Sequence, residues 1–342
     1  MNYQRNAPIY YLSFQLEESE FFLYIEKHAI NIKETYEKYE YVRNVIFENL
    51  EPEIYTLSKG QNANEIVQSF IINTPDKSIN VFKQIKGHIN ELSKNNHGTY
   101  VVQLLIENIQ EEYIPQISEE LKGHTLELIN NKNGYRVLQR LIPRQRKEEN
   151  DRIYEDLKKN LVYFAKDKYG SFVVQEIVKK CSEPNYSEIV QKIWKNLEDF
   201  ISDEFGNYII TLILKDKKIK DKINLDKLYP LIKGHIFDFS MSKNTSRIIE
   251  KALELGNEIQ RKNIINEILE LDKVKKDCLT TLSKNKYGNY IVQLLLKFSD
   301  NISRENMIQK ILSDPNAGKG NGSFVLYYIK KIKNELRGVL LI

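Results

Sequence analysis

The chain has 342 residues, of which 41% are hydrophobic and 29% charged, and its formal net charge is +4. Glycine and proline are scarce while leucine, isoleucine, lysine and glutamate abound, a composition that favours helices. The two cysteines, Cys181 and Cys278, have no metal-type spacing, so we expect neither a disulfide scaffold nor a metal site. Because no apolar run of about 18 residues occurs and residues 1–15 lack a signal-peptide core, we expect a cytoplasmic protein with no membrane span.

The first segment differs in charge from the rest. Residues 1–60 hold six Lys/Arg and ten Asp/Glu, which leaves the remainder mildly basic. A basic remainder is compatible with a nucleic-acid partner, although charge alone is weak evidence for one. We expect residues 1–52 to be a helical cap that includes a degenerate repeat over Leu16–Ile30. Leu23, Tyr24 and Lys27 would be its polar positions, and we assign it no ligand.

A seven-residue motif with glycine in second place recurs through the chain. Five clear copies span residues 97–103, 133–139, 169–175, 205–211 and 287–293, with glycines at 98, 134, 170, 206 and 288. Three poorer copies span residues 62–68, 244–250 and 321–327, with Ala63, Thr245 and Gly322 at the glycine place. The first three steps between the clear copies are 36 residues each. A period of that length predicts a stacked array of repeats.

Each period predicts a short helix, a turn and a longer helix that begins at the motif. At about 100° per residue, Val101 and Val102 share one side of such a helix, and Thr99, Tyr100 and Gln103 share the other. Repeating this helix in register would place a ladder of polar patches along one face, which suits a linear ligand. Because the steps from Gly206 to Thr245 and from Thr245 to Gly288 are 39 and 43 residues, we expect extra loop or helix residues around 215–230 and 254–275.

A second phrase, Lys-Gly-His, precedes three of the motifs by eleven residues. Its copies contain His88, His124 and His235. Repetition at one place in each unit indicates a turn or cap and not a metal site. We find no nucleophile–histidine–carboxylate set and no paired cysteines, so we expect no enzymatic activity and no cofactor.

The polar residues of the motif vary while its apolar frame does not. They are Asn64, Glu65, Gln68; Thr99, Tyr100, Gln103; Tyr135, Arg136, Gln139; Ser171, Phe172, Gln175; Asn207, Tyr208, Thr211; Ser246, Arg247, Glu250; and Asn289, Tyr290, Gln293. A nucleic-acid base needs two polar partners for its edge and a planar group for its face. Residues one helical turn apart can hold an edge, and the residue beside the first can stack. Asn plus Gln complements uracil, and a carboxylate that accepts two guanine N–H groups is selective for guanine.

The array resembles the Pumilio, or PUF, family of single-stranded RNA-binding proteins. The resemblance rests on the Asn-Tyr-x-x-Gln, Ser-Arg-x-x-Glu and Gly-His-x-x-x-Leu phrases in a 36-residue period, over roughly residues 53–330. It implies an all-α, right-handed α-solenoid: a curved, armadillo-like array of about eight three-helix repeats with terminal caps. We therefore expect one array over residues 1–342, with seven readable repeats over 53–312 and a C-terminal cap over 313–342. Residues 329–342 are expected to form a capping helix.

The resemblance also implies a partial RNA sequence. In this family the RNA runs antiparallel to the chain and one base faces each repeat. Asn289 with Gln293 implies U, and Ser246 with Glu250 implies G. Asn207 implies U although Thr211 replaces the usual Gln, and the Ser171 triad implies A. The expected core is therefore 5′-UGUA. Towards the 3′ end, Tyr135 is bulky, Thr99 with Gln103 could take A or U, and Glu65 replaces a stacking residue beside Asn64 and Gln68, so we expect loose specificity there.

The resemblance further implies binding to mRNA 3′ untranslated regions and a role as an adaptor in repression or decay. We expect a monomer whose convex face recruits protein co-repressors. Two alternatives remain open at this point. A helical-repeat scaffold for proteins explains the period and the apolar frame equally well, but not the recurrent amide, planar and Gln pattern. A related ribosome-assembly protein could bind structured RNA without reading bases.

Overall fold

The computed structural model describes residues 17–215 and 225–339, and this described part of the chain is helical with no β-strand. The expectation of an all-α repeat array is therefore confirmed. Contacts divide the chain into two units, up to Ile189 and from Val190, and the division falls inside helix α15 (Glu183–Lys195). Each unit is described by itself below. No helix in the described ranges has the length and apolar character needed to cross a membrane.

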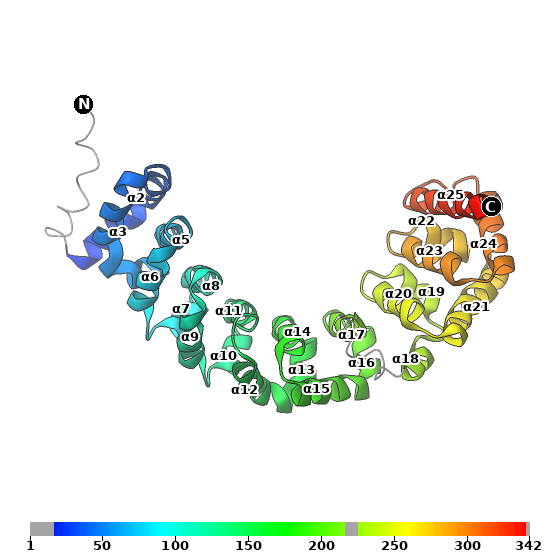
Figure 1. Ribbon diagram of the computed structural model, residues 1–342, viewed down its shortest axis with the longest axis horizontal. Coiled ribbons are helices and arrows are strands. Elements are labelled where there is room, and N and C mark those ends of the chain that lie inside the picture. The colour runs from blue at the N-terminus through cyan, green and yellow to red at the C-terminus, as the bar shows by residue number, and fades with distance from the viewer. Residues whose placement is uncertain (1–16, 216–224, 340–342) are drawn as a thin grey trace. The chain divides into compact units, whose positions relative to one another are not determined.

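The first unit contains one long helix followed by sets of three helices. Its helices before α15 are α2 (Glu18–Lys38), α3 (Arg43–Leu50), α4 (Ile54–Lys59), α5 (Asn64–Asn73), α6 (Ser78–Ile85), α7 (Ile89–Lys94), α8 (Gly98–Asn108), α9 (Ile114–Leu121), α10 (Thr125–Ile129), α11 (Gly134–Leu141), α12 (Lys147–Leu157), α13 (Leu161–Lys166) and α14 (Gly170–Lys180). Single 3₁₀ turns span Glu40–Val42, Glu51–Glu53, Pro75–Lys77, Glu111–Tyr113 and Lys158–Asn160. Helices α5, α8, α11 and α14 pack in sequence along one side, and α6, α9 and α12 lie on the opposite side (Figure 1).

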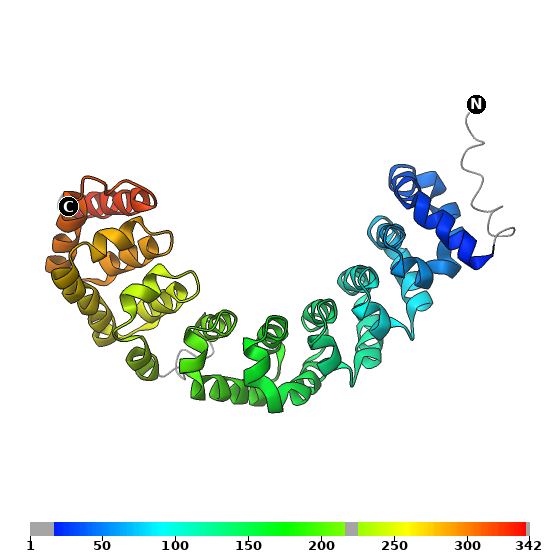
Figure 2. The same cartoon turned by 180° about the vertical axis from the view of Figure 1, so that it is seen from behind.

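The second unit repeats this arrangement. Its helices are α16 (Leu197–Ile201), α17 (Gly206–Lys215), α18 (Leu225–Ile232), α19 (Ile236–Met241), α20 (Ser246–Leu255), α21 (Glu258–Lys275), α22 (Cys278–Lys284), α23 (Gly288–Phe298), α24 (Asn301–Ser313) and α25 (Gly322–Val339). Helices α17, α20, α23 and α25 pack in sequence, as the view from behind also shows (Figure 2). The motif helices thus form one row in each unit.

The structure locates one of the two expected length extensions. The 18-residue helix α21 is the extension expected around 254–275. Most of the other expected insertion, residues 216–224, lies outside the described residues. The C-terminal capping helix begins at Gly322, earlier than expected, and its last expected residues from Leu340 to Ile342 also lie outside them, as does Leu16 of the expected degenerate repeat.

The Lys-Gly-His phrase is a turn between two helices, as predicted. Gly87 has a φ of +88°, a left-handed conformation that glycine adopts without a steric penalty. A carboxylate from the following helical set closes this turn, because Glu120 accepts hydrogen bonds from the backbone N–H groups of Gly87 and Ile89 at 2.9 and 3.3 Å. The imidazole of His88 lies 3.6 Å from the Glu91 carboxylate on the surface.

Candidate functional site

The motif glycine allows the motif helix to approach the short helix before it. A Cβ on Gly170 would lie 2.6 Å from the carbonyl oxygen of Phe164, six residues earlier, which is closer than side chains tolerate. An Asp or Asn three residues before the glycine closes the same turn. Asp167 Oδ1 accepts from the backbone N–H groups of Tyr169 and Gly170 at 2.9 and 2.7 Å. The equivalent side chains are Asn95, Asn131, Asp203 and Asn285. These capping residues were missed in the sequence, although their constant spacing from the glycine was visible there.

Two of the three poorer motifs, those with Ala63 and Thr245 at the glycine place, are held by other contacts. The Thr245 hydroxyl donates to the carbonyl oxygen of Phe239 over 2.8 Å, so a hydrogen bond replaces the close approach of glycine. At the front of the array, Glu26 of α2 supplies the capping carboxylate from a different helix. It accepts from the backbone N–H groups of Asn62 and Ala63 at 2.6 and 3.0 Å. Both motifs are therefore genuine members of the repeat.

The first polar residue of each motif is buried and not exposed as the helical wheel predicted. The residues are Asn64, Thr99, Tyr135, Ser171, Asn207, Ser246 and Asn289, and none is more than 7% exposed. Two of them, Thr99 and Tyr135, contact the next repeat, which simple helical periodicity does not reveal. The asparagine amides hold the preceding turn, since Asn289 Nδ2 donates to the carbonyl oxygens of Asn285 and Lys286 at 3.0 and 2.9 Å. This burial fixes the orientation of the first residue.

In three motifs, at α5, α8 and α23, the third polar residue donates a hydrogen bond to the first, one helical turn away. Gln68 Nε2 donates to Asn64 Oδ1 over 2.6 Å, and Gln103 Nε2 donates to Thr99 Oγ1 over 2.9 Å. Thr211 is different. Its hydroxyl donates to the main-chain oxygen of Asn207 over 2.9 Å and its side chain is buried. The expectation that Thr211 reaches less far than a glutamine is consistent with this contact.

The middle residue of most motifs extends away from the helical core. Tyr100 and Tyr290 are 54% and 59% exposed, and Phe172 is 39% exposed. Arg136 and Arg247 are also exposed, whereas Tyr208 is half-buried. A planar side chain beside a polar pair is the arrangement that can hold the face and edge of a base together.

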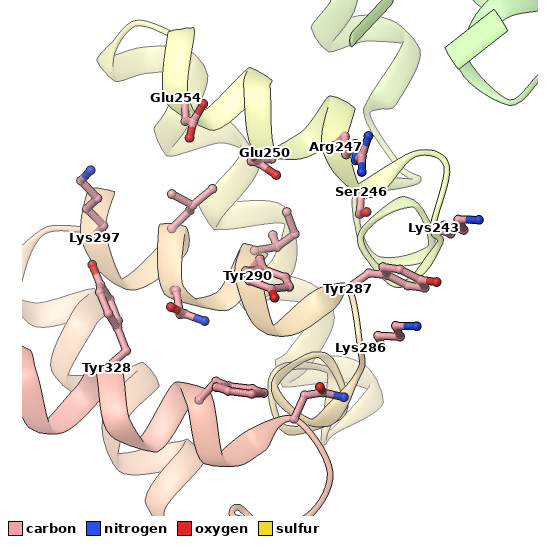
Figure 3. A pocket seen from close by; sticks show the side chains of 15 residues that line it. Lys243, Ser246, Arg247, Glu250, Glu254, Lys286, Tyr287, Tyr290, Lys297 and Tyr328 are labelled. Carbon is pink, nitrogen blue, oxygen red and sulfur yellow. The ribbon is translucent and has the colours of Figure 1, made fainter. Parts of the chain in front are cut away.

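A groove of about 1010 Å³ lies over α20, α23 and α25. It is lined by Ser246, Arg247 and Glu250 of one triad and by Tyr290 and Gln293 of the next. Figure 3 shows Glu250 facing Tyr290 across it, with Ser246 and Arg247 towards one end and Lys297 and Tyr328 towards the other. Four cationic and two anionic side chains line it: Lys243, Arg247, Lys286, Lys297, Glu250 and Glu254. The excess of positive charge suits a polyanion, and Glu250 adds one carboxylate acceptor within a basic frame.

The motif at α5 departs from this pattern because its middle residue is acidic. Glu65 pairs with Lys33 of α2 over 2.8 Å, and this hydrogen bond raises the pKa of Lys33. Both side chains border a groove of about 390 Å³ that also contains Asn64 and Gln68. The negative charge of Glu65 is therefore partly offset by the helix of the N-terminal cap.

The fold is that of a helical-repeat protein. In each readable motif two polar residues lie one helical turn apart, and a third side chain follows the first of them. Five segments match the family model of the Pumilio-family RNA binding repeat, at residues 88–122, 124–157, 160–194, 235–269 and 279–312. These segments make up just over half of the chain, and the protein belongs to this family. No curated protein sequence matched the chain.

Solved structures of RNA-binding domains share the fold. The Puf3 RNA binding domain bound to a Cox17 RNA 3′ UTR recognition sequence is 21% identical, with a TM-score of 0.70 over 90% of this chain and 95% of that one. PUF-8 in complex with PBE-RNA is 20% identical, with a TM-score of 0.67 over 96% and 97%. The RNA-binding domain of yeast Puf5p bound to SMX2 RNA is 20% identical, with a TM-score of 0.56 over 95% and 99%.

Proposed function

We propose that the row of motif helices binds single-stranded RNA with one base facing each triad and a 5′-UGUA core. The observation that carries this proposal is the pairing of the first and third polar residues beside an exposed planar side chain. It recurs at α8 and α23, where Gln103 and Gln293 donate to Thr99 and Asn289. Polar groups that the chain already orients lose less entropy on binding than free ones do.

The groove over α20 and α23 supports the order of the first two bases. Gln293 at the groove and Asn289, to which it donates, offer an amide pair suited to uracil. Glu250 offers a carboxylate suited to the N1–H and N2–H₂ donors of guanine. Lys243, Lys286 and Lys297 at the groove can face phosphates. In the proposed core, the triads of α17 and α14 bind the third and fourth bases, U and A.

The cellular role follows from family membership by analogy. We propose that the protein is a cytoplasmic monomer that binds mRNA 3′ untranslated regions and acts as an adaptor for repression or decay, with co-repressors on the face opposite the triads. The relatives named above are bound to RNA, one of them to a 3′ UTR recognition sequence, and this supports the proposal.

Selection of bound RNAs from a random pool tests the function directly. We expect enrichment of UGUA in single-stranded context and a binding constant that weakens as salt rises, because phosphate contacts release counterions. Enrichment of structured RNA without a sequence motif would favour a ribosome-assembly role. No RNA enrichment, together with a stable protein complex, would favour a scaffold and reject the proposal.

A further inference from the structure

One motif contains an aromatic residue where the others contain a small or amide side chain. Tyr135 takes the first polar place on α11 and is only 7% exposed. Its ring stacks on Tyr169 with ring centroids 4.9 Å apart and an interplanar angle of 18°. It also stacks on Phe172, at 5.7 Å and 25°. The Arg136 guanidinium lies over the same ring, 5.3 Å from its centroid.

Two of these three partners, Arg136 and Phe172, are ones that a base would use. Arg136 and Phe172 are the stacking residues of two successive motifs, α11 and α14. The first-position side chain of α8 faces the next motif along the chain, since the Thr99 hydroxyl lies 3.4 Å from the Asn133 carbonyl oxygen just before α11. Tyr135 faces the next motif in the same way, through its contact with Phe172. The gap that the α11 triad would read is therefore the one between Arg136 and Phe172. The Tyr135 ring contacts Arg136 and Phe172, the two side chains that flank this gap.

We propose that Tyr135 takes the place of a nucleotide base in this gap, so that the fifth base of the bound RNA, just after UGUA, is left outside it and is not read. The inference rests on the proposed RNA binding and refines it. A base could enter only by displacing a buried ring that three side chains hold in stacked or cation–π contact. A nucleotide whose base lies outside the gap can still contribute to affinity through its phosphate, but its base edge makes no contact with the protein. The α11 repeat thus acts as a spacer between the UGUA-reading motifs and those of α8 and α5.

Removal of single bases from the RNA tests this in the unaltered protein. Affinities would be measured for UGUA-containing RNAs with an abasic site or each of the four bases at position 5, and with an abasic site at position 3 for comparison. We expect all five position-5 RNAs to bind within about twofold of one another. The abasic site at position 3 should weaken binding on the order of tenfold or more, since one stacked base contributes about this much.

A small side chain at Tyr135 should restore base reading. Tyr135→Ser creates a Ser, Arg and Gln triad, which has the same polar pair as Ser171 and Gln175. We expect this variant to lose roughly tenfold in affinity when base 5 is abasic and to prefer adenine there. Tyr135→Phe keeps the ring and should behave as the unaltered protein. 2-Aminopurine at position 5 should fluoresce strongly with the unaltered protein and be quenched with Tyr135→Ser.

The outcomes separate the two proposals. If the unaltered protein loses about tenfold with an abasic site at position 5 while UGUA is still required, the base displaces Tyr135 and this inference is wrong, although the proposed function stands. If UGUA is not required at all, both fail. Because the abasic comparison needs no substitution, it remains decisive even if Tyr135→Ser does not fold.

Discussion

Gln293 and Asn289 lie one turn apart on α23, and Gln293 Nε2 donates to Asn289 Oδ1 over 3.3 Å. Asn289 Nδ2 in turn donates to two main-chain oxygens of the preceding turn. The polar pair is thus held in place by the chain before any ligand arrives. On the neighbouring helix α20, Ser246 and Glu250 occupy the same two places, so the two motifs differ mainly in the chemistry they offer.

Replacing the polar pair of one motif by that of the other should change which base the motif prefers. In the double variant Ser246→Asn with Glu250→Gln, α20 would carry the pair found on α23. The protein should then prefer UUUA over UGUA, with a reversal of about tenfold or more, because a well-placed bidentate contact contributes about 1–3 kcal/mol of discrimination. Competition binding measures this. The reverse exchange, Asn289→Ser with Gln293→Glu, is the matched control and should favour guanine at the first base. A folded double variant that still prefers UGUA would show that the assignment of bases to repeats is wrong.

Tyr290 should contribute to binding by stacking and little to folding. Its side chain is 59% exposed, so Tyr290→Ala should leave the melting temperature nearly unchanged. The affinity for UGUA RNA should fall about tenfold or more, since a stacked base is worth roughly 1–3 kcal/mol. Tyr163 on α13 is 61% exposed but belongs to no triad, and Tyr163→Ala should not alter affinity. Equal affinity of Tyr290→Ala and the unaltered protein would remove Tyr290 from the site.

Base discrimination should be weaker at the N-terminal motifs than at the C-terminal ones. At α5 the Glu65–Lys33 pair takes the place of a stacking residue. Changing the RNA base opposite α5 should therefore lower the binding affinity less than about threefold. Changing the guanine opposite α20 should lower it about tenfold or more. Glu65→Tyr would create the Asn, Tyr and Gln triad of α23 and should raise the cost at that base towards tenfold. Equal losses at both ends of the RNA for the unaltered protein would contradict this prediction.

The motif glycine should be required for packing. In Gly170→Ala the new methyl group would meet the Phe164 carbonyl oxygen at 2.6 Å, so the helices must move apart. Overpacking of this kind costs about 1–3 kcal/mol of unfolding free energy. Gly318→Ala is the control, because its nearest neighbour is a Leu326 methyl carbon at 3.6 Å, an ordinary contact. Chemical denaturation of both variants measures the difference, and equal stability would mean that the backbone at Gly170 adjusts freely.

Much of the fold was predictable because the repeat is periodic. The spacing of Gly98, Gly134 and Gly170 predicted a stacked helical array, and the alternation of apolar and polar residues within each motif predicted the buried frame of Val101 and Val102. The turn role of the Lys-Gly-His phrase followed from its repetition. The one-turn pairing of Gln103 with Thr99 likewise follows from helical geometry alone.

The sequence by itself thus determined the number of motif copies, their helical character and the residue types that each presents. Only the tertiary structure decided how those residues are shared between neighbouring repeats. The capping of the Asn62 turn by Glu26, the pairing of Glu65 with Lys33 and the stacking of Tyr135 on Phe172 all join residues about one period apart. Helical periodicity governs contacts within a few residues, whereas contacts between repeats depend on how closely the helices pack. In this protein that packing stacks the Tyr135 ring on Tyr169 and Phe172 of the next repeat and leaves the side chains of Tyr100 and Tyr290 exposed.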